Sequence, residues 1–398
     1  MVGGGFAGAT CARYLKLWAP AIDVTLVEPQ KAYVPCPMSN RLLGGTFNLR
    51  DLMRDYGALS RNYGVRVVHD QVTAVDLRAR SARLERGDTL PWDRLVLAAG
   101  IDFDAQRVAG LASALQAEQI LHAWRGGSQQ IWELRKRIDA MPAGGVVALH
   151  VPKAPYRCPP GPYERASLIA HYLQHNNPRA KVLLFDANPD VVAKKGLFVS
   201  TWKERYAGVV EYVPNADLTE VSGRDRWIEM KMQGRVKADV INIIPPNRAP
   251  ALAARIGLTA HNGSWCPVDF TTYESTLAAN VHIIGDGIES APGLPKSGHL
   301  ANQTAKVCAA AIAARYRGDS RALAPVIANT CYSFVDANSA MHVAAVYRYD
   351  NTARTMVPVK ESTGTSAAPN AAEGVSAIGW AHNLLADTFG STFALLVQ

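Results

Sequence analysis

The chain lacks the features that mark nucleic-acid-binding and membrane-spanning proteins. Lys and Arg together (42) exceed Asp and Glu (34), but no run of five Lys or Arg residues occurs in the 398-residue sequence. Nucleic-acid-binding proteins gather their basic residues in patches, so this scattered excess favours an acidic protein partner or an anionic substrate. No apolar stretch reaches the roughly 18 residues of a membrane span. What remains is a globular protein, and its length favours two or three domains.

The cysteines lack the spacings of metal and haem sites. The six are Cys11, Cys36, Cys158, Cys266, Cys308 and Cys331. No two of them form a CxxC pair, so the CxxCH motif of a c-type haem is absent. No cluster of His, Cys and carboxylate residues has the spacing of a zinc site. We therefore expect neither a metal nor a haem in this chain.

A glycine-rich stretch at the start of the chain has the spacing of a dinucleotide-binding loop. Gly3, Gly5 and Gly8 form a GxGxxG pattern, and Glu28 ends an apolar run twenty residues after the third glycine. The first glycine allows a tight turn, the second lets the backbone approach a pyrophosphate, and the third lets the helix pack on the strand. A carboxylate at the position of Glu28 can bind a ribose hydroxyl. The pattern predicts a bound dinucleotide.

A second motif, far along the chain, identifies the dinucleotide as FAD. The apolar strand Val281–Ile284 ends in Gly-Asp, which places Asp286 where flavoenzymes with two dinucleotide-binding domains contact the ribityl chain. An earlier apolar strand ends at Gly100, where the small residue leaves room for a cofactor. Lys296 then precedes a helix whose N-terminus would face the flavin. This lysine is either solvated surface or a charge that stabilises the reduced flavin.

The N-terminus of the sequence is unusually close to the glycine loop. Only Met1 and Val2 precede it, whereas a first strand needs about five residues. We therefore expect a trimmed N-terminus, so that the lack of a visible signal peptide says little about the compartment.

Strand and helix patterns alternate over most of the chain. Residues 1–107 show this rhythm, with short strands expected at 65–69 and 72–77, and residues 108–243 repeat it. Residues 244–320 are expected to return to the first unit, which makes a discontinuous FAD-binding domain. Residues 321–398 form a third unit, richer in Thr, Ser and Asn than in regular apolar alternation.

The second unit has prolines where a nucleotide-binding loop would have glycines. In flavoproteins with two such domains, this unit binds NAD(P)H through a GxGxxG turn after its first strand. Here the turn at 152–161 is rich in proline, which prevents close approach of a phosphate and an open helix N-terminus. We expect a Rossmann-like domain without a functional NAD(P)H site.

Five segments give the sequence a recognisable resemblance. They are Tyr33–Asn40, Arg157–Ala166, Trp265–Asp269, Asn329–Ser333 and Asp387–Gly390. Together they closely resemble the flavoprotein subunit of flavocytochrome c sulfide dehydrogenase, over essentially the whole chain. The resemblance implies an α/β fold with two dinucleotide-binding (Rossmann-like) domains of the glutathione-reductase type and a C-terminal α+β interface domain.

The resemblance also implies roles for individual residues. In that family FAD is joined through its 8α-methyl carbon to a cysteine that matches Cys36, although a small buried hydrophobic role is the alternative. A redox-active disulfide facing the flavin matches Cys158 and Cys331, and a purely structural cross-link between two domains is the alternative. A glutamate near this disulfide matches Glu164, which is alternatively just the first acid of a helix.

The implied activity is oxidation of hydrosulfide to polysulfide or elemental sulfur. Electrons would pass through the disulfide and FAD to a c-type cytochrome subunit, which carries the haem of a periplasmic heterodimer. A sulfide:quinone reductase is one alternative, and it should have an apolar quinone channel and amphipathic membrane helices near its C-terminus. A non-catalytic flavin-binding partner subunit is the other, and its flavin would stay oxidised in the presence of sulfide.

Overall fold

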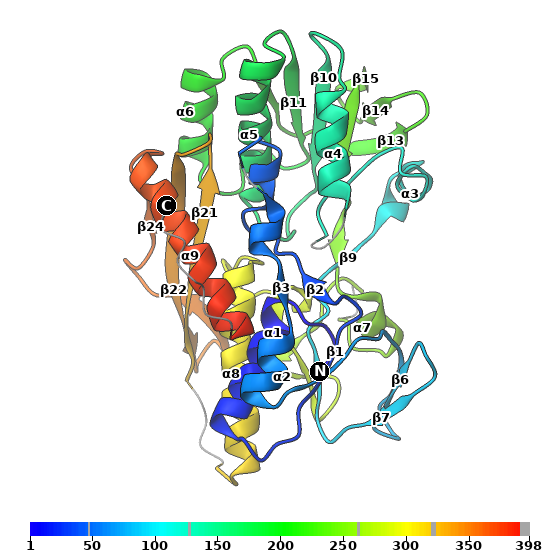
Figure 1. Ribbon diagram of the computed structural model, residues 1–398, viewed down its shortest axis with the longest axis vertical. Coiled ribbons are helices and arrows are strands. Elements are labelled where there is room, and N and C mark those ends of the chain that lie inside the picture. The colour runs from blue at the N-terminus through cyan, green and yellow to red at the C-terminus, as the bar shows by residue number, and fades with distance from the viewer. Residues whose placement is uncertain (47, 126–128, 261–262, 320–323, 391–398) are drawn as a thin grey trace.

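The computed structural model of the chain describes residues 1–46, 48–125, 129–260, 263–319 and 324–390. Figure 1 shows an elongated molecule, with the first domain at the bottom and the second at the top. The C-terminal strands and helix run along one side, across the junction between the two domains. The expected boundary at residue 320 falls outside the described residues.

The first domain is built on a sheet whose central pairings are parallel. In order across the sheet its members are β4 (Arg66–Val68), β1 (Thr25–Val27), the single residue Val2, β8 (Leu95–Leu97), β20 (Val281–Ile283), β19 (Glu274–Ser275) and β18 (Val268–Asp269). The central strands are short apolar runs that are largely buried, as in a sheet with helices on its faces. Two helices of this domain, α1 (Phe6–Trp18) and α8 (Gly298–Tyr316), pack against each other.

The strand expected at 72–77 exists but does not join the parallel sheet. It is β5 (Val72–Asp76), which forms an antiparallel sheet with β6 (Ser81–Leu84) and β7 (Thr89–Pro91). Only three residues separate β4 from β5. A parallel connection needs a crossover of about a dozen residues or more, so β5 has to turn away from the parallel sheet.

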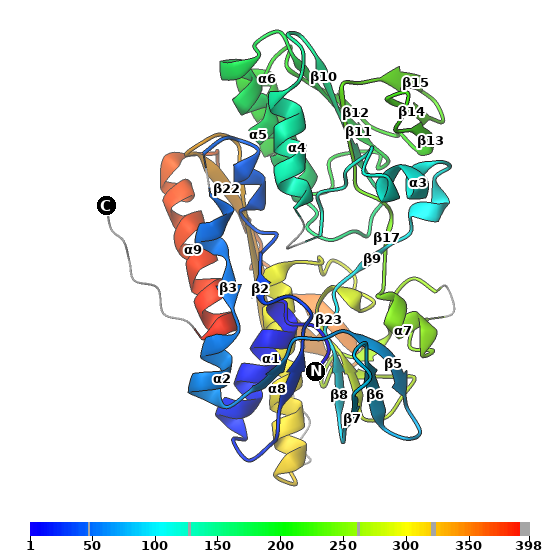
Figure 2. The ribbon, with the colours of Figure 1, turned by 45° about the vertical axis from the view of Figure 1, so that its right-hand side comes forward.

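The second domain repeats the parallel arrangement. Its strand order is β12 (Val210–Val213), β11 (Lys181–Asp186), β10 (Val146–Val151) and β16 (Val240–Ile243). Its main helices are α4 (Gln130–Asp139), α5 (Gly161–Asn176) and α6 (Lys195–Arg205). A small antiparallel sheet of β13 (Leu218–Ser222), β14 (Trp227–Met230) and β15 (Gly234–Lys237) lies at one edge (Figure 2).

Two short strands mark where the chain passes between the domains. The chain leaves the first domain at β9 (Asp102–Phe103) and returns at β17 (Asn247–Arg248), and these strands pair with each other. The first domain is therefore discontinuous in sequence, and α8 belongs to it although it follows the second domain along the chain.

The C-terminal unit is more regular than its composition suggested. β21 (Val326–Phe334) and β22 (Ala340–Asp350) form a long antiparallel pair, extended by β23 (Thr355–Pro358) and β24 (Gly364–Thr365). Helix α9 (Ala371–Phe389) follows, capped by the Asn370 side chain and ended by Gly390 at a φ of +68°. Elements pack on both faces of β21, including α8, α9 and α5, so apolar residues do not alternate cleanly along it.

The remaining elements are short. They are β2 (Ala32–Tyr33), β3 (Arg54–Asp55), α2 (Gly57–Tyr63), α3 (Leu111–Gln116), α7 (Ala251–Arg255), β18 and β19 given above, and the 3-10 turns at Ser39–Leu42, Leu49–Leu52, Ala105–Arg107 and Gly285–Gly287. Within the described residues, no helix combines the length and the apolar character needed to cross a membrane.

Candidate active site

The glycine loop joins Val2 to α1 and fits tightly over the strands beneath it. Gly3 has a φ of +98°, and a Cβ atom there would lie 2.6 Å from the carbonyl oxygen of Ala98. A Cβ atom on Gly8 would lie 1.9 Å from the carbonyl oxygen of Gly3, so only glycine lets α1 pack onto the loop. Gly5 is the N-cap of α1, and no described side chain caps the first turn. The free N–H groups there suit an anion such as a pyrophosphate.

Glu28 closes the glycine loop from the next strand. One carboxylate oxygen accepts a hydrogen bond from the backbone N–H of Gly4 at 2.7 Å, and the other accepts from that of Gln30 at 2.9 Å. The carboxylate keeps further lone pairs for a ribose hydroxyl, which is the role predicted for it. The buried hydroxyl of Tyr56 has no hydrogen-bond partner among the described residues. It lies within reach of Gly4, where a Cβ atom would be 2.8 Å away.

Asp286 and Lys296 lie together at the carboxyl end of β20. Burial raises the pKa of Asp286, and the positive charges of Arg157 and Lys296 oppose that increase. Lys296 is 4% exposed, which excludes the solvated-surface alternative. Its Nζ donates to the carbonyl oxygens of Asp286 (2.9 Å) and Ile288 (2.6 Å), and burial lowers its pKa to about 8. Lys296 therefore fixes the backbone of the loop that carries Asp286. Gly100, at the end of the neighbouring strand, has open space where a side chain would be.

Arg157 gives a test of whether a flavin dinucleotide fits this region. Its charge acts on Cys36 and Asp286, and its Nε and Nη2 atoms are buried with no hydrogen-bond partner among the described residues. A guanidinium remains charged in a protein, and a buried charge is normally paired. The oxygen-rich groups of FAD would satisfy both nitrogens. The residues from the glycine loop to Asp286 therefore fit FAD.

Cys36 lies in the loop after β2, half buried, with its Sγ atom 3.9 Å from the carbonyl oxygen of Trp124. Arg165 fixes the opposing loop from the second domain. This arginine is 1% exposed, and it donates hydrogen bonds to the carbonyl oxygens of Ala123 (2.6 Å) and His122 (3.0 Å). Its guanidinium also lies 4.8 Å from the centre of a Trp124 ring. The thiol of Cys36 thus lies beside a loop that Arg165 holds in place, and near the charge of Arg157.

The segment that leads into α8 holds the two cysteines of the predicted disulfide. The backbone N–H of Cys158 donates to the carbonyl oxygen of Lys296 at 2.8 Å. The Ser297 hydroxyl donates to Asn329 Oδ1 at 2.6 Å, and the Asn329 amide in turn donates to Cys331 Sγ at 3.8 Å. Two residues that are 173 positions apart are thereby brought to one place. Both are free thiols in this structure, so their pairing stays a prediction.

The two thiols have different electrostatic surroundings. Burial raises the pKa of both. At Cys158 the negative charges of Cys331 and Glu164 add to the increase, and the guanidinium of Arg157 only partly opposes it, so the pKa stays well above its usual value. At Cys331 the ammonium of Lys194 and hydrogen bonds from Asn329 and Ser297 act in the opposite direction. The arrangement therefore favours the anionic form at Cys331 over that at Cys158.

Glu164 lies in the first turn of α5, 8% exposed, between the second domain and the C-terminal strands. Its two carboxylate oxygens accept hydrogen bonds from the Asn40 side chain (2.9 Å) and from the backbone N–H of Phe334 (2.8 Å). Burial raises its pKa, and those two hydrogen bonds oppose the increase. A carboxyl group with a raised pKa near two thiols can take up and release a proton.

The proline-rich turn after β10 is filled by protein side chains. Tyr156 is 2% exposed, and its hydroxyl donates to the carbonyl oxygen of Pro159 at 3.0 Å. The Asn188 side chain accepts from the backbone N–H of Ala154 at 2.9 Å and donates to the carbonyl oxygen of Pro152 at 3.0 Å. This packing fixes the turn after β10, and with it the position of Cys158.

Matches to known families decide the identity of the chain. Residues 132–245 match the model described as "Sulfide dehydrogenase [flavocytochrome c] flavoprotein chain, central", and residues 323–389 match "Flavocytochrome c sulphide dehydrogenase, flavin-binding". The sulfide dehydrogenase [flavocytochrome c] flavoprotein chain of Chlorobaculum thiosulfatiphilum is 60% identical over 40 residues, which are 10% of this chain and 83% of that sequence. The chain belongs to the flavocytochrome c sulfide dehydrogenase flavoprotein family.

Other similarities concern the fold of the chain. Residues 1–136 match the pyridine nucleotide-disulphide oxidoreductase model. The crystal structure of the sulfide:quinone oxidoreductase from Aquifex aeolicus has a TM-score of 0.79 at 17% identity, covering 98% of this chain and 90% of that one. The putidaredoxin reductase structure, in its covalent complex with putidaredoxin, has a TM-score of 0.66 at 18% identity, covering 87% of this chain and 80% of that chain. The predicted fold class is thereby confirmed.

The curated full-length relatives are longer than the part that this chain matches. Mitochondrial sulfide:quinone oxidoreductase from Mus musculus is 21% identical over 303 residues, and the one from Dictyostelium discoideum is 25% identical over 295 residues. Each alignment covers 72% of this chain but only 64% of the relative.

The structure brings most of the sequence-predicted residues of the family site together, and it adds others. Cys158, Cys331, Glu164, Lys296 and Asp286 all lie around the segment that leads into α8, whereas the glycine loop and Glu28 lie at the far end of the dinucleotide site. Three charged residues were not found from the sequence: Arg157, Arg165 and Lys194. Arg157 and Arg165 flank conspicuous cysteine and glutamate positions, but Lys194 lies in an exposed-looking Ala-Lys-Lys-Gly run that carries no signal.

Among the described residues, no group of three or more His, Cys, Asp or Glu is placed to hold a metal ion.

Proposed function

We propose that this chain is the flavoprotein subunit of a sulfide dehydrogenase that oxidises hydrosulfide to polysulfide or elemental sulfur. The observation that carries this proposal is the meeting of Cys158 and Cys331 at the Lys296–Ser297 segment, directly before the helix next to Asp286. Two thiols from different domains, beside a flavin-binding aspartate, suit transfer of an electron pair from sulfur to a flavin. Membership of the flavocytochrome c sulfide dehydrogenase family supports the choice of substrate.

The cysteines perform the sulfur chemistry when they are oxidised to a disulfide. A hydrosulfide ion attacks one sulfur, so that one S–S bond forms and the Cys158–Cys331 bond breaks. One cysteine then carries a persulfide, and the other keeps the electron pair of the broken bond as a thiolate. A second hydrosulfide removes the added sulfur. The reaction releases protons, and Glu164 is positioned to take up a proton from the persulfide S–H.

FAD, when bound, accepts the electron pair and passes electrons on singly. The glycine loop and Glu28 would hold its adenosine diphosphate part, Asp286 its ribityl chain, and Arg157 an electron-rich edge. The start of α8 would lie toward the ring system, where its N-terminus favours negative charge.

We also propose that FAD is attached covalently to Cys36. Attachment requires a thiol that the flavin can reach, and Cys36 lies in the loop after β2, close to the guanidinium that is proposed to contact FAD. The half-buried thiol in a loop between two domains supports the same interpretation better than a purely structural role.

The partner of the site is proposed to be a c-type cytochrome subunit, in a periplasmic heterodimer where a disulfide can persist. NAD(P)H is not proposed as a substrate, because Tyr156 and the surrounding prolines fill the turn where its phosphates would bind. Electrons would leave the flavin toward the cytochrome.

An anaerobic titration of the purified protein with sulfide, followed by acid precipitation, tests these proposals. Bleaching of the flavin absorbance by stoichiometric sulfide, with yellow colour kept in the pellet, is expected. Bleaching with the colour in the supernatant would keep the enzyme and remove the Cys36 linkage. A flavin that stays oxidised would refute the sulfide dehydrogenase function and favour a non-catalytic subunit.

Comparison of electron acceptors separates the family activity from that of a sulfide:quinone reductase. The fold similarity to the Aquifex aeolicus enzyme makes this comparison necessary. We expect sulfide-dependent reduction of a c-type cytochrome and no reduction of a soluble quinone analogue. The opposite pattern would reassign the chain to quinone reduction.

A further inference from the structure

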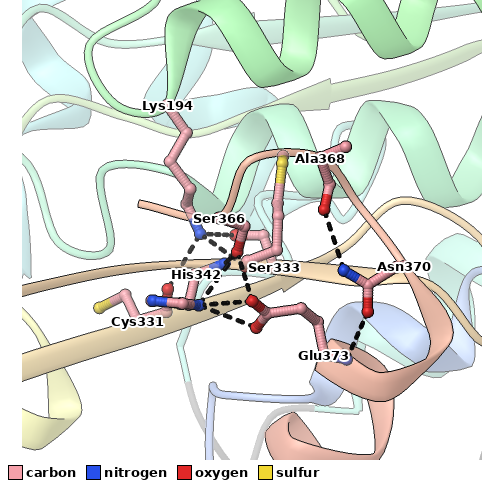
Figure 3. Close-up of polar contacts among 9 residues, drawn as sticks. Lys194, Cys331, Ser333, His342, Ser366, Ala368, Asn370 and Glu373 are labelled. Atoms are coloured by element: carbon pink, nitrogen blue, oxygen red, sulfur yellow. Dashed lines mark hydrogen bonds and ion pairs between the residues drawn. The ribbon is translucent and has the colours of Figure 1, made fainter. Parts of the chain in front are cut away.

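Lys194 crosses from the second domain to the strand that carries Cys331. It is the N-cap residue of α6, with a left-handed φ of +57°. Its Nζ donates to the carbonyl oxygen of Cys331 (3.0 Å), the hydroxyl of Ser333 (2.8 Å) and the carbonyl oxygen of Met341 (3.2 Å). Figure 3 shows the ammonium hydrogen-bonded to the backbone carbonyl of Cys331, whose sulfur points away from it on the same strand.

All three hydrogens of this ammonium are donated to neutral acceptors. An ammonium has only three hydrogens, so these bonds satisfy its donors but leave its charge without a bonded anion. Burial lowers the pKa of Lys194 to about 8, and the groups that oppose this change are, in order, Cys331, Glu164, Cys158 and Glu373. A buried charge is normally compensated by an opposite one.

The two carboxylates nearby are engaged elsewhere. Glu164 accepts from Asn40 and from the backbone N–H of Phe334. Glu373 contacts His342 Nδ1 at 2.8 Å and accepts from the Ser366 hydroxyl at 2.8 Å, as Figure 3 shows. Two thiols remain, and of these Cys331 acts on Lys194 more strongly than Cys158.

We propose that Lys194 is the counter-ion of Cys331 and holds this sulfur as a thiolate once the disulfide with Cys158 is opened. The proposal rests on the proposed function, because it needs a disulfide that opens during turnover. It also gives the disulfide a polarity, by which we mean that hydrosulfide attacks one particular sulfur and the other leaves as the thiolate. The thiol that is the stronger acid leaves faster in thiol–disulfide exchange, and Lys194, Asn329 and Ser297 all favour the anion at Cys331.

The polarity can be written as a balanced step. Hydrosulfide ion attacks the sulfur of Cys158, a new S–S bond forms there, and the Cys158–Cys331 bond breaks with its electron pair going to Cys331. Cys158 then carries the persulfide S–SH, Cys331 carries the thiolate, and the single negative charge of hydrosulfide has moved next to Lys194. No other reactant is needed for this step.

The test compares Lys194→Gln, which keeps hydrogen-bond donors but removes the charge, with Lys194→Arg, which keeps the charge. Lys195→Gln is the matched control, since its side chain is 62% exposed and pairs with Asp190 on the surface. Retention of bound flavin and of the far-ultraviolet spectrum shows which variants fold. In each holoprotein, the midpoint of the Cys158–Cys331 disulfide is measured against dithiothreitol, and the alkylation rate of reduced Cys331 is followed against pH by mass spectrometry.

We expect Lys194→Gln to shift the disulfide midpoint toward lower potential, because loss of the counter-ion destabilises the reduced state. We also expect alkylation of Cys331 near pH 7 to slow by about tenfold, which corresponds to about one unit of pKa. Lys194→Arg should restore most of both values, and Lys195→Gln should change neither. Unchanged values in Lys194→Gln would overturn the counter-ion role. If Lys194→Gln does not fold, the pH profiles of alkylation of Cys331 and Cys158 are compared in the reduced wild-type holoprotein. Cys331 should react at lower pH than Cys158, and the opposite order would overturn the counter-ion role.

A single-turnover experiment tests the polarity. The oxidised wild-type holoprotein is mixed anaerobically with less than one equivalent of sulfide and alkylated at once. The added sulfur is expected on the Cys158 peptide, and its presence on the Cys331 peptide would overturn the polarity. Absence of a Cys158–Cys331 disulfide in the oxidised wild type would instead refute the proposed function itself, so the two failures are distinguishable.

Discussion

At the scale of single residues, the chemistry depends on side chains whose ordinary acidity the fold has changed. Burial raises the pKa of Glu164 and lowers that of Lys296 to about 8. Both changes bring the pKa of the group closer to neutral pH, where a side chain transfers protons efficiently. Neither residue is in a position that would be chosen for stability alone, because each carries a charge that is expensive to bury.

The two site cysteines should be separable from the core cysteines by mutation. Cys158→Ser and Cys331→Ser are each expected to lower sulfide-dependent flavin reduction by at least about a thousandfold, because a single thiol cannot form the exchanging disulfide. The measurement is stopped-flow bleaching with sulfide. Cys308→Ala, in the fully buried contact of α1 with α8, is the control and should keep the rate while lowering stability slightly. Normal bleaching in Cys331→Ser would show that the disulfide is not required.

Glu164 should govern the pH dependence of the reaction. Its carboxyl group must be ionised to accept a proton, so the wild-type rate is expected to fall on the acidic side as this group becomes protonated. Since burial raises the pKa of Glu164, the fall should begin above the ordinary range of a glutamate. In Glu164→Gln the plateau rate should drop by roughly tenfold or more. Once the rates are corrected for the fraction of sulfide present as hydrosulfide ion, the acidic limb that remains in the wild type should disappear in the variant. The rate is measured from about pH 5 to pH 8, and an acidic limb that persists in the variant would assign it to another group.

At the scale of secondary-structure elements, two helix N-termini offer a matched comparison. Ser297 caps α8 by accepting from the backbone N–H of Leu300 at 3.1 Å, and Asn370 caps α9 by accepting from that of Glu373 at 2.9 Å. Ser297→Ala and Asn370→Ala should each reduce the free energy of unfolding by about 1 kcal/mol. Only Ser297 also contacts the amide beside Cys331, so only its variant should slow alkylation of that thiol. Thermal unfolding and alkylation kinetics measure the two effects, and equal alkylation in both variants would contradict the predicted link.

How well the sequence predicted each element depended on whether its pairing was local. The strand expected at 65–69 was predicted nearly as observed, because its apolar run is visible within a few residues. The strand at 72–76 was recognised, but its antiparallel pairing was not, since that depends on the length of the connection before it. The long strands β21 and β22 were missed as regular structure because buried positions do not alternate cleanly along them.

The same distinction holds for the site. Motifs and the family resemblance named the candidate residues that the structure brings together, since glycines, cysteines and acids stand in recognisable runs. The residues that adjust this chemistry were not identifiable, because their effect exists only after folding. Lys194 is 137 positions from Cys331, and Arg165 reaches Asn40 from 125 positions away. No local pattern encodes a contact of that range.

At the scale of the whole molecule, buried neutral histidines make stability depend on pH. Burial lowers the pKa of His150 and of His282 from 6.5 to about 4, and each ring contacts a backbone carbonyl oxygen. Below pH 6.5 the unfolded chain binds protons that the folded chain does not, so stability present above that pH is lost as the pH falls toward 4. At about pH 5.5 the loss is about 1 kcal/mol for each histidine.

This prediction is checked by urea unfolding of the holoprotein at about pH 7.5 and pH 5.5. The loss of unfolding free energy between the two pH values should be smaller in His150→Leu than in the wild type by about 1 kcal/mol. Each protein is compared with itself, so the opposite contributions of Glu164 and Asp286, whose pKa values are raised, cancel in the difference. An unchanged loss in the variant would mean that His150 is protonated in the folded state.

The segment before α8, to which Cys158 and Cys331 are both attached, has a consequence for biogenesis. One cysteine is carried by the second domain and the other by a strand close to the C-terminus, so neither meets the other until the last element has docked on the first two. Contacts between residues so far apart in sequence form late in folding, because closing the long loop between them costs conformational entropy before the contact can contribute any stability. If the proposed disulfide forms, its oxidation therefore marks a completely assembled chain. A nascent or truncated chain could fold its glycine loop but could not form this bond, so the proposed reaction with sulfide would begin only after assembly.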